Sequence, residues 1–224
     1  MYHWMEDKTF LSRMRTHCSD IVNRLVQAIN SEGQMHVKQH LVGSGAKNLI
    51  VQNGDEPVDL DYNLEIVNSE EFEINDCRGI KTYVQKKFNE VLKKAGWADC
   101  QDSTSALTTE KRHFVQRAQT EFSIDLCIVA VDSESRWYRL IHEKTGYVRN
   151  DRYFWNEAPQ SKGLFDRVEW LKKNHWWNEV RDTYLEKKNM YLQRNNHDHP
   201  SFVVYIETVN EVYSKHHPGL RRDV

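Results

Sequence analysis

The chain has 224 residues, with 31 Lys and Arg against 33 Asp and Glu and a net charge of −2. This length allows a buried core and a cleft, while the near-zero charge disfavours a dedicated binder of duplex nucleic acid, which usually carries a basic surplus. A mean hydropathy of −0.79 without any long apolar run argues against a membrane-spanning helix, and the N-terminus lacks the pattern of a secretory signal. The four cysteines include no CxxC pair, which is typical of a reducing, cytoplasmic protein.

The first half of the chain alternates helical and strand patterns. Apolar residues at helical spacing predict a helix over about 8–30, followed by a strand over 34–42 that leads into a Gly-Ser turn and a turn-rich connection. Strict alternation of apolar and polar residues over 58–67 predicts a strand with one polar face. A capped helix is predicted from 75 or 76 to about 94.

The second half begins with strands and ends with helices. Strands are predicted over 103–109 and 121–131, and a hairpin pairs 137–142 with 147–153. Helical spacing then covers three segments, which are 164–174, 177–194 and 201–215. The order predicts an α+β fold: a small mixed β-sheet with flanking helices in residues 1–158, and a C-terminal helical region in residues 159–224.

Charge is unevenly distributed in this chain. Residues 48–77 contain nine acidic residues and no Lys or Arg. Asp59 and Asp61 lie on the polar face of the predicted strand 58–67, whereas Glu70, Glu71 and Glu73 follow it and are interpreted as a solvated loop. A local acidic surplus of this kind either stays solvated or binds a positively charged group.

Three polar features point to one site. Gly43-Ser44 follows a predicted strand, Asp59 and Asp61 share one strand face, and Asp125 stands on the polar face of the strand 121–131. Carboxylates this close repel one another and raise one another's pKa. Mg²⁺ relieves the repulsion, because it prefers oxygen ligands and binds substrate phosphates. A Gly-Ser turn offers backbone N–H groups and a hydroxyl that suit a phosphate chain.

With Gly43-Ser44, Asp59-x-Asp61 and Asp125 in the setting FSIDLCIV, the sequence resembles the polymerase-β-type nucleotidyltransferase superfamily. The stretch TSALT at 104–108, which precedes the third acid, resembles the corresponding part of the larger members of the superfamily, such as the oligoadenylate synthetases and cyclic GMP-AMP synthase. The resemblance covers about residues 30–135. The separation of Ser44 from Asp59 is longer than in the smallest members, so no subfamily is assigned.

The resemblance implies a two-metal nucleotidyltransferase. Asp59 and Asp61 would bind both Mg²⁺ (or Mn²⁺) ions, Asp125 would bind the catalytic ion and help to activate the acceptor, and Gly43 and Ser44 would hold the triphosphate. The expected reaction moves a nucleoside monophosphate from an NTP, ATP being favoured, to an acceptor hydroxyl and releases pyrophosphate.

Two questions stay open at this level. The acceptor is expected to be a small molecule or a nucleotide; a protein hydroxyl and a tRNA end stay open, although the absence of a basic surplus argues mildly against RNA. Lys47, just beyond the Gly-Ser turn, or Lys172-Lys173 could neutralise the triphosphate, and Lys47 is preferred. The alternative function is a catalytically inactive, nucleotide-binding regulatory or antitoxin-type protein of the same fold.

Overall fold

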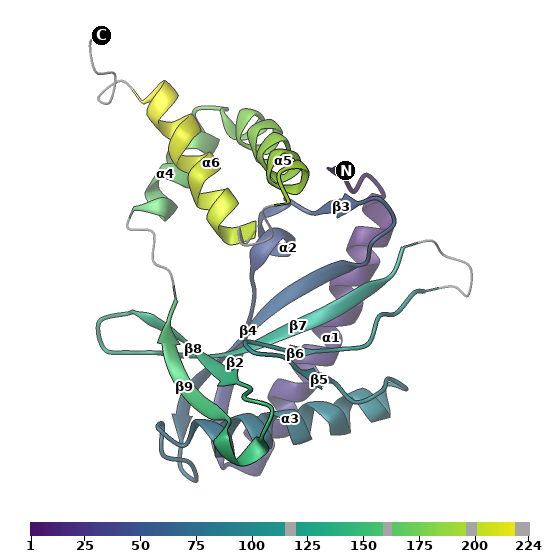
Figure 1. Cartoon of the computed structure of the whole chain (residues 1–224), viewed down its shortest axis with the longest axis vertical. Coiled ribbons are helices and arrows are strands. Elements are labelled where there is room, and N and C mark those ends of the chain that lie inside the picture. Colours follow the sequence, from purple (N-terminus) through teal and green to yellow (C-terminus); the bar gives the residue numbers. More distant parts are fainter. Residues whose placement is uncertain (115–119, 159–162, 196–200, 218–224) are drawn as a thin grey trace. The chain divides into compact units, whose positions relative to one another are not determined.

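The structure is a computed structural model that describes residues 1–114, 120–158, 163–195 and 201–217. The chain forms two compact units (Figure 1). The larger one comprises Glu6–Asn48 and Asp55–Gln160, and the smaller one comprises Met1–Met5, Leu49–Gly54 and Ser161–Val224. The smaller unit thus includes two short segments that precede residue 158, namely Met1–Met5 and Leu49–Gly54.

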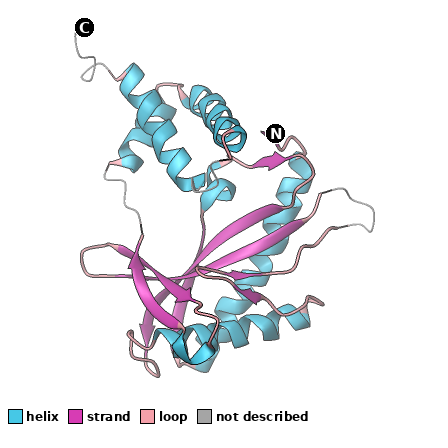
Figure 2. Ribbon diagram, viewed as in Figure 1, coloured by secondary structure: helices cyan, strands magenta, loops and turns pink. Residues whose placement is uncertain are grey.

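The larger unit contains a mixed β-sheet with two long helices (Figure 2). Its elements in chain order are α1 (Lys8–Glu32), β2 (Met35–Leu41), α2 (Gly43–Lys47), β4 (Val58–Ser69), α3 (Cys77–Lys94), β5 (Gln101–Asp102), β6 (Leu107–Thr108), β7 (Phe122–Val131), β8 (Trp137–Glu143), the 3₁₀ turn η1 (Val148–Asn150) and β9 (Arg152–Glu157).

The sheet has the order β2-β4-β7-β6-β5, and β8 pairs with both β7 and β9. Strands β4 and β7 run parallel over nine register pairs, from Val58–Phe122 to Ile66–Ala130, and the other pairings are antiparallel. Parallel strands need a long crossover, and α3 lies in the connection between β4 and β7. The α+β class and the mixed sheet predicted from the sequence are confirmed.

The two long helices begin and end where their sequences predict. Asp7 and Asp76 cap α1 and α3, because their carboxylates accept hydrogen bonds from the amides of Phe10 and Gly79, each at 2.9 Å. Helix α1 ends at Gly33, whose φ of 72° suits a glycine C-cap. The apolar stripes of both helices are fully buried, as are the inward-facing residues of β4, so one face of the sheet supports the core.

Three local predictions are corrected by the structure. The Gly-Ser segment is the start of the short helix α2 instead of a plain turn. The strand expected over 103–109 is split into β5 and β6, because the Ser103 hydroxyl and amide both donate to the carbonyl of Ala106, each at 2.9 Å, and close a turn. The second hairpin strand begins at Arg152, because η1 occupies Val148–Asn150.

The smaller unit is helical. It contains β1 (Tyr2–Trp4), β3 (Val51–Asn53), α4 (Leu164–Lys173), α5 (Trp177–Gln193) and α6 (Ser201–His216), and β1 pairs antiparallel with β3. Leu49 is buried in the same apolar cluster as residues of all three helices, such as Leu171, Val180 and Val204. The sequence analysis did not predict β1 and β3. These strands are stabilised by pairing with each other and by the side-chain amide of Asn189, which accepts a hydrogen bond from the Tyr2 N–H and donates one to the Tyr2 carbonyl.

Among the described residues, none of the helices combines the length and the apolar character that a membrane crossing requires. The four cysteines are buried and free.

Candidate active site

The polar face of β4 and β7 carries the predicted acids. Because these strands are parallel and in register, Asp59 lies opposite Ser123 and Asp61 lies opposite Asp125. The Ser123 hydroxyl donates a short hydrogen bond to the carboxylate of Asp59. Side chains alternate along a strand, so the same face that carries Asp61 is turned away from the core residues Leu60 and Tyr62. The structure thus brings all three predicted acids onto one face of two adjacent strands.

Gly43 lies directly against Asp61. The amide of Val42 donates to the Asp61 carbonyl at 2.9 Å, and a Cβ atom added to Gly43 would come within 2.2 Å of the Asp61 carboxylate oxygen. Gly43 also has a φ of +62°, a backbone conformation that residues other than glycine rarely adopt. Two independent features therefore favour glycine at position 43: the positive φ of the backbone and the close approach of the α2 backbone to the Asp61 carboxylate.

The acids repel one another in a partly desolvated environment. Burial, followed by the carboxylates of Asp125 and Asp59, raises the pKa of Asp61 to about 6, against the opposing charges of Arg139 and Lys47. Burial also raises the pKa of Asp125, although the hydrogen bond from Thr108 acts in the opposite direction. Such shifts are typical of functional sites, where burial and neighbouring like charges perturb the pKa values of the reacting groups.

A threonine in the β5–β6 region positions the third acid. The Thr108 hydroxyl donates to an Asp125 carboxylate oxygen at 2.6 Å, and the two residues are register partners on β6 and β7. In the sequence, the stretch 104–108 is distinguished only by its resemblance to the larger members of the superfamily. Its contribution to the site comes from an antiparallel pairing between distant segments, which no local pattern encodes.

Two cations flank Asp61. Lys47 closes α2, where its ammonium donates to the Gly43 carbonyl at 3.3 Å, and its charge counters the raised pKa of Asp61. Arg139 on β8, which sequence reasoning missed, acts on Asp61 in the same direction, and its buried Nε finds no hydrogen-bond partner among the described residues. Ser44 is half-buried in α2 beside Gly43.

The alternative cations, Lys172 and Lys173, belong to the smaller unit. Lys172 belongs to α4 of the smaller unit, where its ammonium forms an ion pair with Glu169 at 3.6 Å and stands 5.3 Å from the ring centre of Trp177. These contacts give Lys172 a role in its own helix pair.

The donor set suits a hard divalent cation, because three carboxylates on one strand face supply oxygen ligands and negative charge. In their present rotamers, however, the described residues contain no group of three or more His, Cys, Asp or Glu side chains arranged to hold a metal ion. Asp59 and Asp125 are instead engaged by the hydroxyls of Ser123 and Thr108. The residues fit the ion by chemistry and by strand position, and binding would require the carboxylates to turn toward it.

No protein-family model and no curated protein matches the sequence. Solved structures do match the fold. CdnC of E. coli MS115-1, in a structure with ATP, has a TM-score of 0.59 at 14% identity over 91% of this chain and 61% of that one. The same protein in a complex with HORMA-deltaN gives 0.56 at 13% identity over 91% and 60%.

A third similar structure is E. coli DncV in a 3′-deoxy GTP bound form, with a TM-score of 0.50 at 15% identity over 82% of this chain and 48% of that one. The chain therefore spans about 61% or less of the length of these proteins. At such low identity the likeness concerns the fold, which is the polymerase-β-type nucleotidyltransferase fold that the sequence motifs indicate.

Proposed function

We propose that the protein is a nucleotidyltransferase that moves a nucleoside monophosphate from an NTP to an acceptor hydroxyl. The observation that supports this most strongly is the register of β4 and β7, which sets Asp61 opposite Asp125 while Gly43 abuts the Asp61 carboxylate. A phosphate-binding backbone segment next to clustered acids is the arrangement that phosphoryl transfer uses.

In the proposed reaction the acceptor oxygen attacks the α-phosphorus of the NTP. A new P–O bond forms to the acceptor, the bond from the α-phosphorus to the oxygen that bridges to the β-phosphate breaks, and pyrophosphate leaves. Asp125 takes the acceptor proton. The main contribution of the site is positioning and electrostatic stabilisation.

Asp59, Asp61 and Asp125 are the residues that would hold Mg²⁺ or Mn²⁺. When bound, these ions supply positive charge to the phosphate oxygens. Gly43 and Ser44 would bind the triphosphate through the backbone and hydroxyl groups at the start of α2, and Lys47 would pair with phosphate charge from the end of the same helix. Thr108 and Ser123 orient two of the carboxylates.

ATP is the proposed donor, and the proposed acceptor is the hydroxyl of a nucleotide or another small molecule. Similar folds are known with ATP in CdnC and with 3′-deoxy GTP in DncV, which supports an NTP as a ligand. Because the chain spans only part of those proteins, their acceptors are not transferred to it.

The test is pyrophosphate release from each of the four NTPs with Mg²⁺ or Mn²⁺, with and without nucleotide and small-molecule acceptors. The wild type should release pyrophosphate, and the Asp59→Ala, Asp61→Ala double variant should not. Nucleotide binding without turnover in both proteins would favour the inactive regulatory alternative. Equal turnover in both would show that other residues carry the chemistry.

A further inference from the structure

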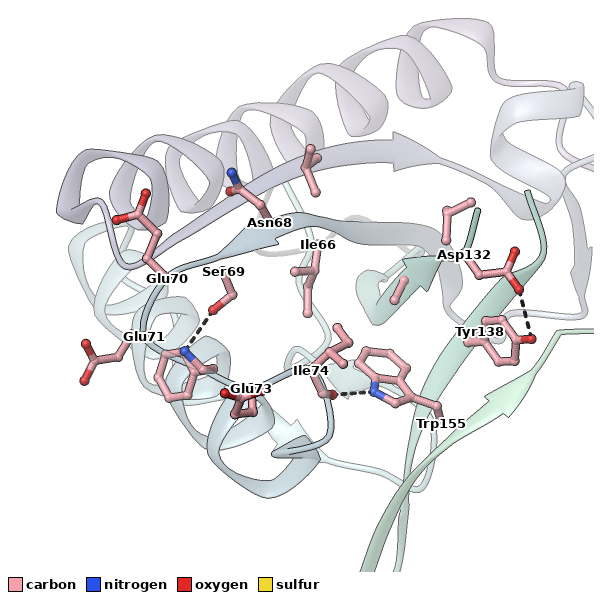
Figure 3. A pocket seen from close by; sticks show the side chains of 14 residues that line it. Ile66, Asn68, Ser69, Glu70, Glu71, Glu73, Ile74, Asp132, Tyr138 and Trp155 are labelled. Carbon is pink, nitrogen blue, oxygen red and sulfur yellow. Dashed lines mark hydrogen bonds between the residues drawn. The ribbon is translucent and has the colours of Figure 1, made fainter. Parts of the chain in front are cut away.

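A pocket of about 630 Å³ opens at the carboxyl ends of β4 and β7. Figure 3 shows its floor near Ile66 and its two ends, with Glu70 and Glu71 at one and Asp132 and Trp155 at the other. The volume lies within the range of specific ligand pockets, which is roughly 300–1,000 Å³. The pocket belongs entirely to the larger unit.

This pocket is distinct from the candidate active site. Its floor is formed by Ile66 and Ala130, which are register partners on β4 and β7. Because side chains alternate along a strand and the register between these strands is unbroken, Ile66 and Ala130 face the opposite side of the sheet from Asp61 and Asp125. A ligand here would not overlap an NTP at the acids.

The charges that border the pocket are negative. Glu70, Glu71 and Glu73 are exposed on the loop after β4, and within the described part of the chain no Lys, Arg or His forms an ion pair with them. The fourth acid, Asp132, is held by the Arg136 guanidinium at 2.7 Å. The carboxylates of Glu70, Glu71 and Glu73 therefore have no cationic partner among the described residues. Because the three negative charges lie on separate side chains, a ligand that carries several cations along a chain complements them better than a single cation does.

The pocket also has a preformed apolar lining, to which Trp155 contributes from β9 and Phe72 and Ile74 contribute from the loop that carries the three glutamates. Trp155 packs at the pocket with its indole N–H donating to the Ile74 carbonyl at 2.7 Å (Figure 3). Phe72 is fixed by the bond from its amide to the Ser69 hydroxyl at 3.0 Å and by its contact with the Tyr83 ring. Exposed Ile74 continues the apolar surface to the rim. A preformed apolar wall beside unpaired carboxylates binds an apolar group that carries positive charge.

We propose that this pocket binds an extended segment of a partner protein in which two or three Lys or Arg residues accompany one aromatic or aliphatic side chain. The apolar side chain enters between Ile66 and Trp155, and the basic side chains meet Glu70, Glu71 and Glu73 at the rim. Peptide grooves of this kind obtain affinity from the buried anchor and selectivity from the charges around it.

The experiment uses the full chain and an array of fluorescein-labelled ten-residue peptides, read by fluorescence polarisation. The array contains peptides with Lys or Arg beside one Leu, Phe or Trp, the same peptides with Glu in place of each base, and basic peptides with Ser in place of the apolar residue. Peptides that are both basic and apolar should bind tightest.

The variants locate the binding. The triple variant Glu70→Gln, Glu71→Gln, Glu73→Gln should weaken the best peptide roughly tenfold, and Trp155→Ala should weaken it further. The matched control is Asp166→Asn, Asp182→Asn, Glu186→Gln, which removes the same charge from exposed helical positions and should leave binding unchanged.

Four results would overturn the proposal. They are an array without preference for basic-apolar peptides, equal binding of the Ser-substituted peptides, equal losses in the two triple variants, and phenethylamine binding as tightly as the best peptide. The last result would identify a small-cation site in place of a peptide site.

Discussion

Asp61 on β4 faces Asp125 on the neighbouring parallel strand β7, and no residue separates the two in the register. Both carboxyl groups have a raised pKa because both are buried and both feel other acids of the cluster. In the folded protein the carboxylates of this cluster therefore repel one another, at the position where the proposed divalent cations would bring positive charge. Each of the following predictions tests a part of this arrangement.

The first prediction concerns stability and pH without metal. The folded pKa of Asp61 is about 6, above its ordinary value of 3.8, so the folded state binds the proton more tightly than the unfolded state. The free energy of unfolding should fall as pH rises through this window. Because Asp61→Asn cannot ionise, the free energy of unfolding of this variant, relative to the wild type, should be higher by about 3 kcal/mol above pH 7 and by much less near pH 4.

Urea unfolding in EDTA at the two pH values measures this difference. A stability difference that is the same at pH 4 and pH 7.5 would show that Asp61 has an ordinary pKa in the folded protein.

The second prediction concerns divalent cations. Mg²⁺ or Mn²⁺ should raise the melting temperature of the wild type in a concentration-dependent way, and a site at 100 times its dissociation constant would add about 2.7 kcal/mol. Asp59→Asn, Asp61→Asn should lose most of the shift. The control Asp182→Asn, Glu186→Gln removes the same charge from exposed positions of α5, and its shift should match the wild type. An equal shift in all three proteins would place the ions elsewhere.

The third prediction concerns Gly43. An alanine Cβ would stand 2.2 Å from the Asp61 carboxylate at a φ of +62°, so Gly43→Ala must displace either α2 or the acid. A displacement of about 1 Å at a reacting centre costs on the order of 100-fold in rate, and we expect a loss of kcat of that size in pyrophosphate release.

Gly54 provides the matched control. Its φ is +55°, yet nothing lies within 4 Å of an added Cβ. Gly54→Ala should therefore lower stability by about 1 kcal/mol through backbone strain and leave kcat unchanged. Similar kinetic losses in the two variants would mean that strain, and not the approach to Asp61, explains the effect.

The fourth prediction concerns Thr108. Its hydroxyl lowers the pKa of Asp125 against the effect of burial, and a hydrogen bond to a charged group contributes about 1.5–3 kcal/mol. Thr108→Val keeps the shape and removes the donor, so the pKa of Asp125 should rise. If Asp125 accepts the acceptor proton, the acidic limb of the kcat/KM profile should move up by about one pH unit. An unchanged limb with a uniformly lower rate would indicate a purely structural role.

Strand alternation was enough to predict that Asp59 and Asp61 share one face, because the period of two is a property of every strand. The same reasoning placed Asp125 on a polar face. What it could not provide was the pairing of β4 with β7 in parallel, which decides that Asp61 meets Asp125. Register between distant strands depends on the whole core and is not written in either segment.

The residues that sequence reasoning missed share this origin. Arg139 lies 78 positions from Asp61 in the sequence, and it acts on that acid because β8 pairs with β7. The hydroxyl of Ser123 reaches Asp59 because the two residues are register partners. Local errors, such as the undivided strand over 103–109, arose where a side-chain hydroxyl closed a turn that β propensity does not anticipate.

The smaller unit is assembled from three separate stretches of chain, and one of them, Leu49–Gly54, lies between Lys47 and Asp59. Proteolysis or truncation at a single point after β9 would therefore not release a clean module. Such a cut would remove the helices that bury Leu49, which is 1% exposed in the folded chain. An apolar segment would then be left in the connection between α2 and β4, the two elements that carry part of the proposed nucleotide site. We therefore expect a fragment that ends after β9 to be less soluble than the whole chain, unless residues 49–54 are replaced by a polar linker.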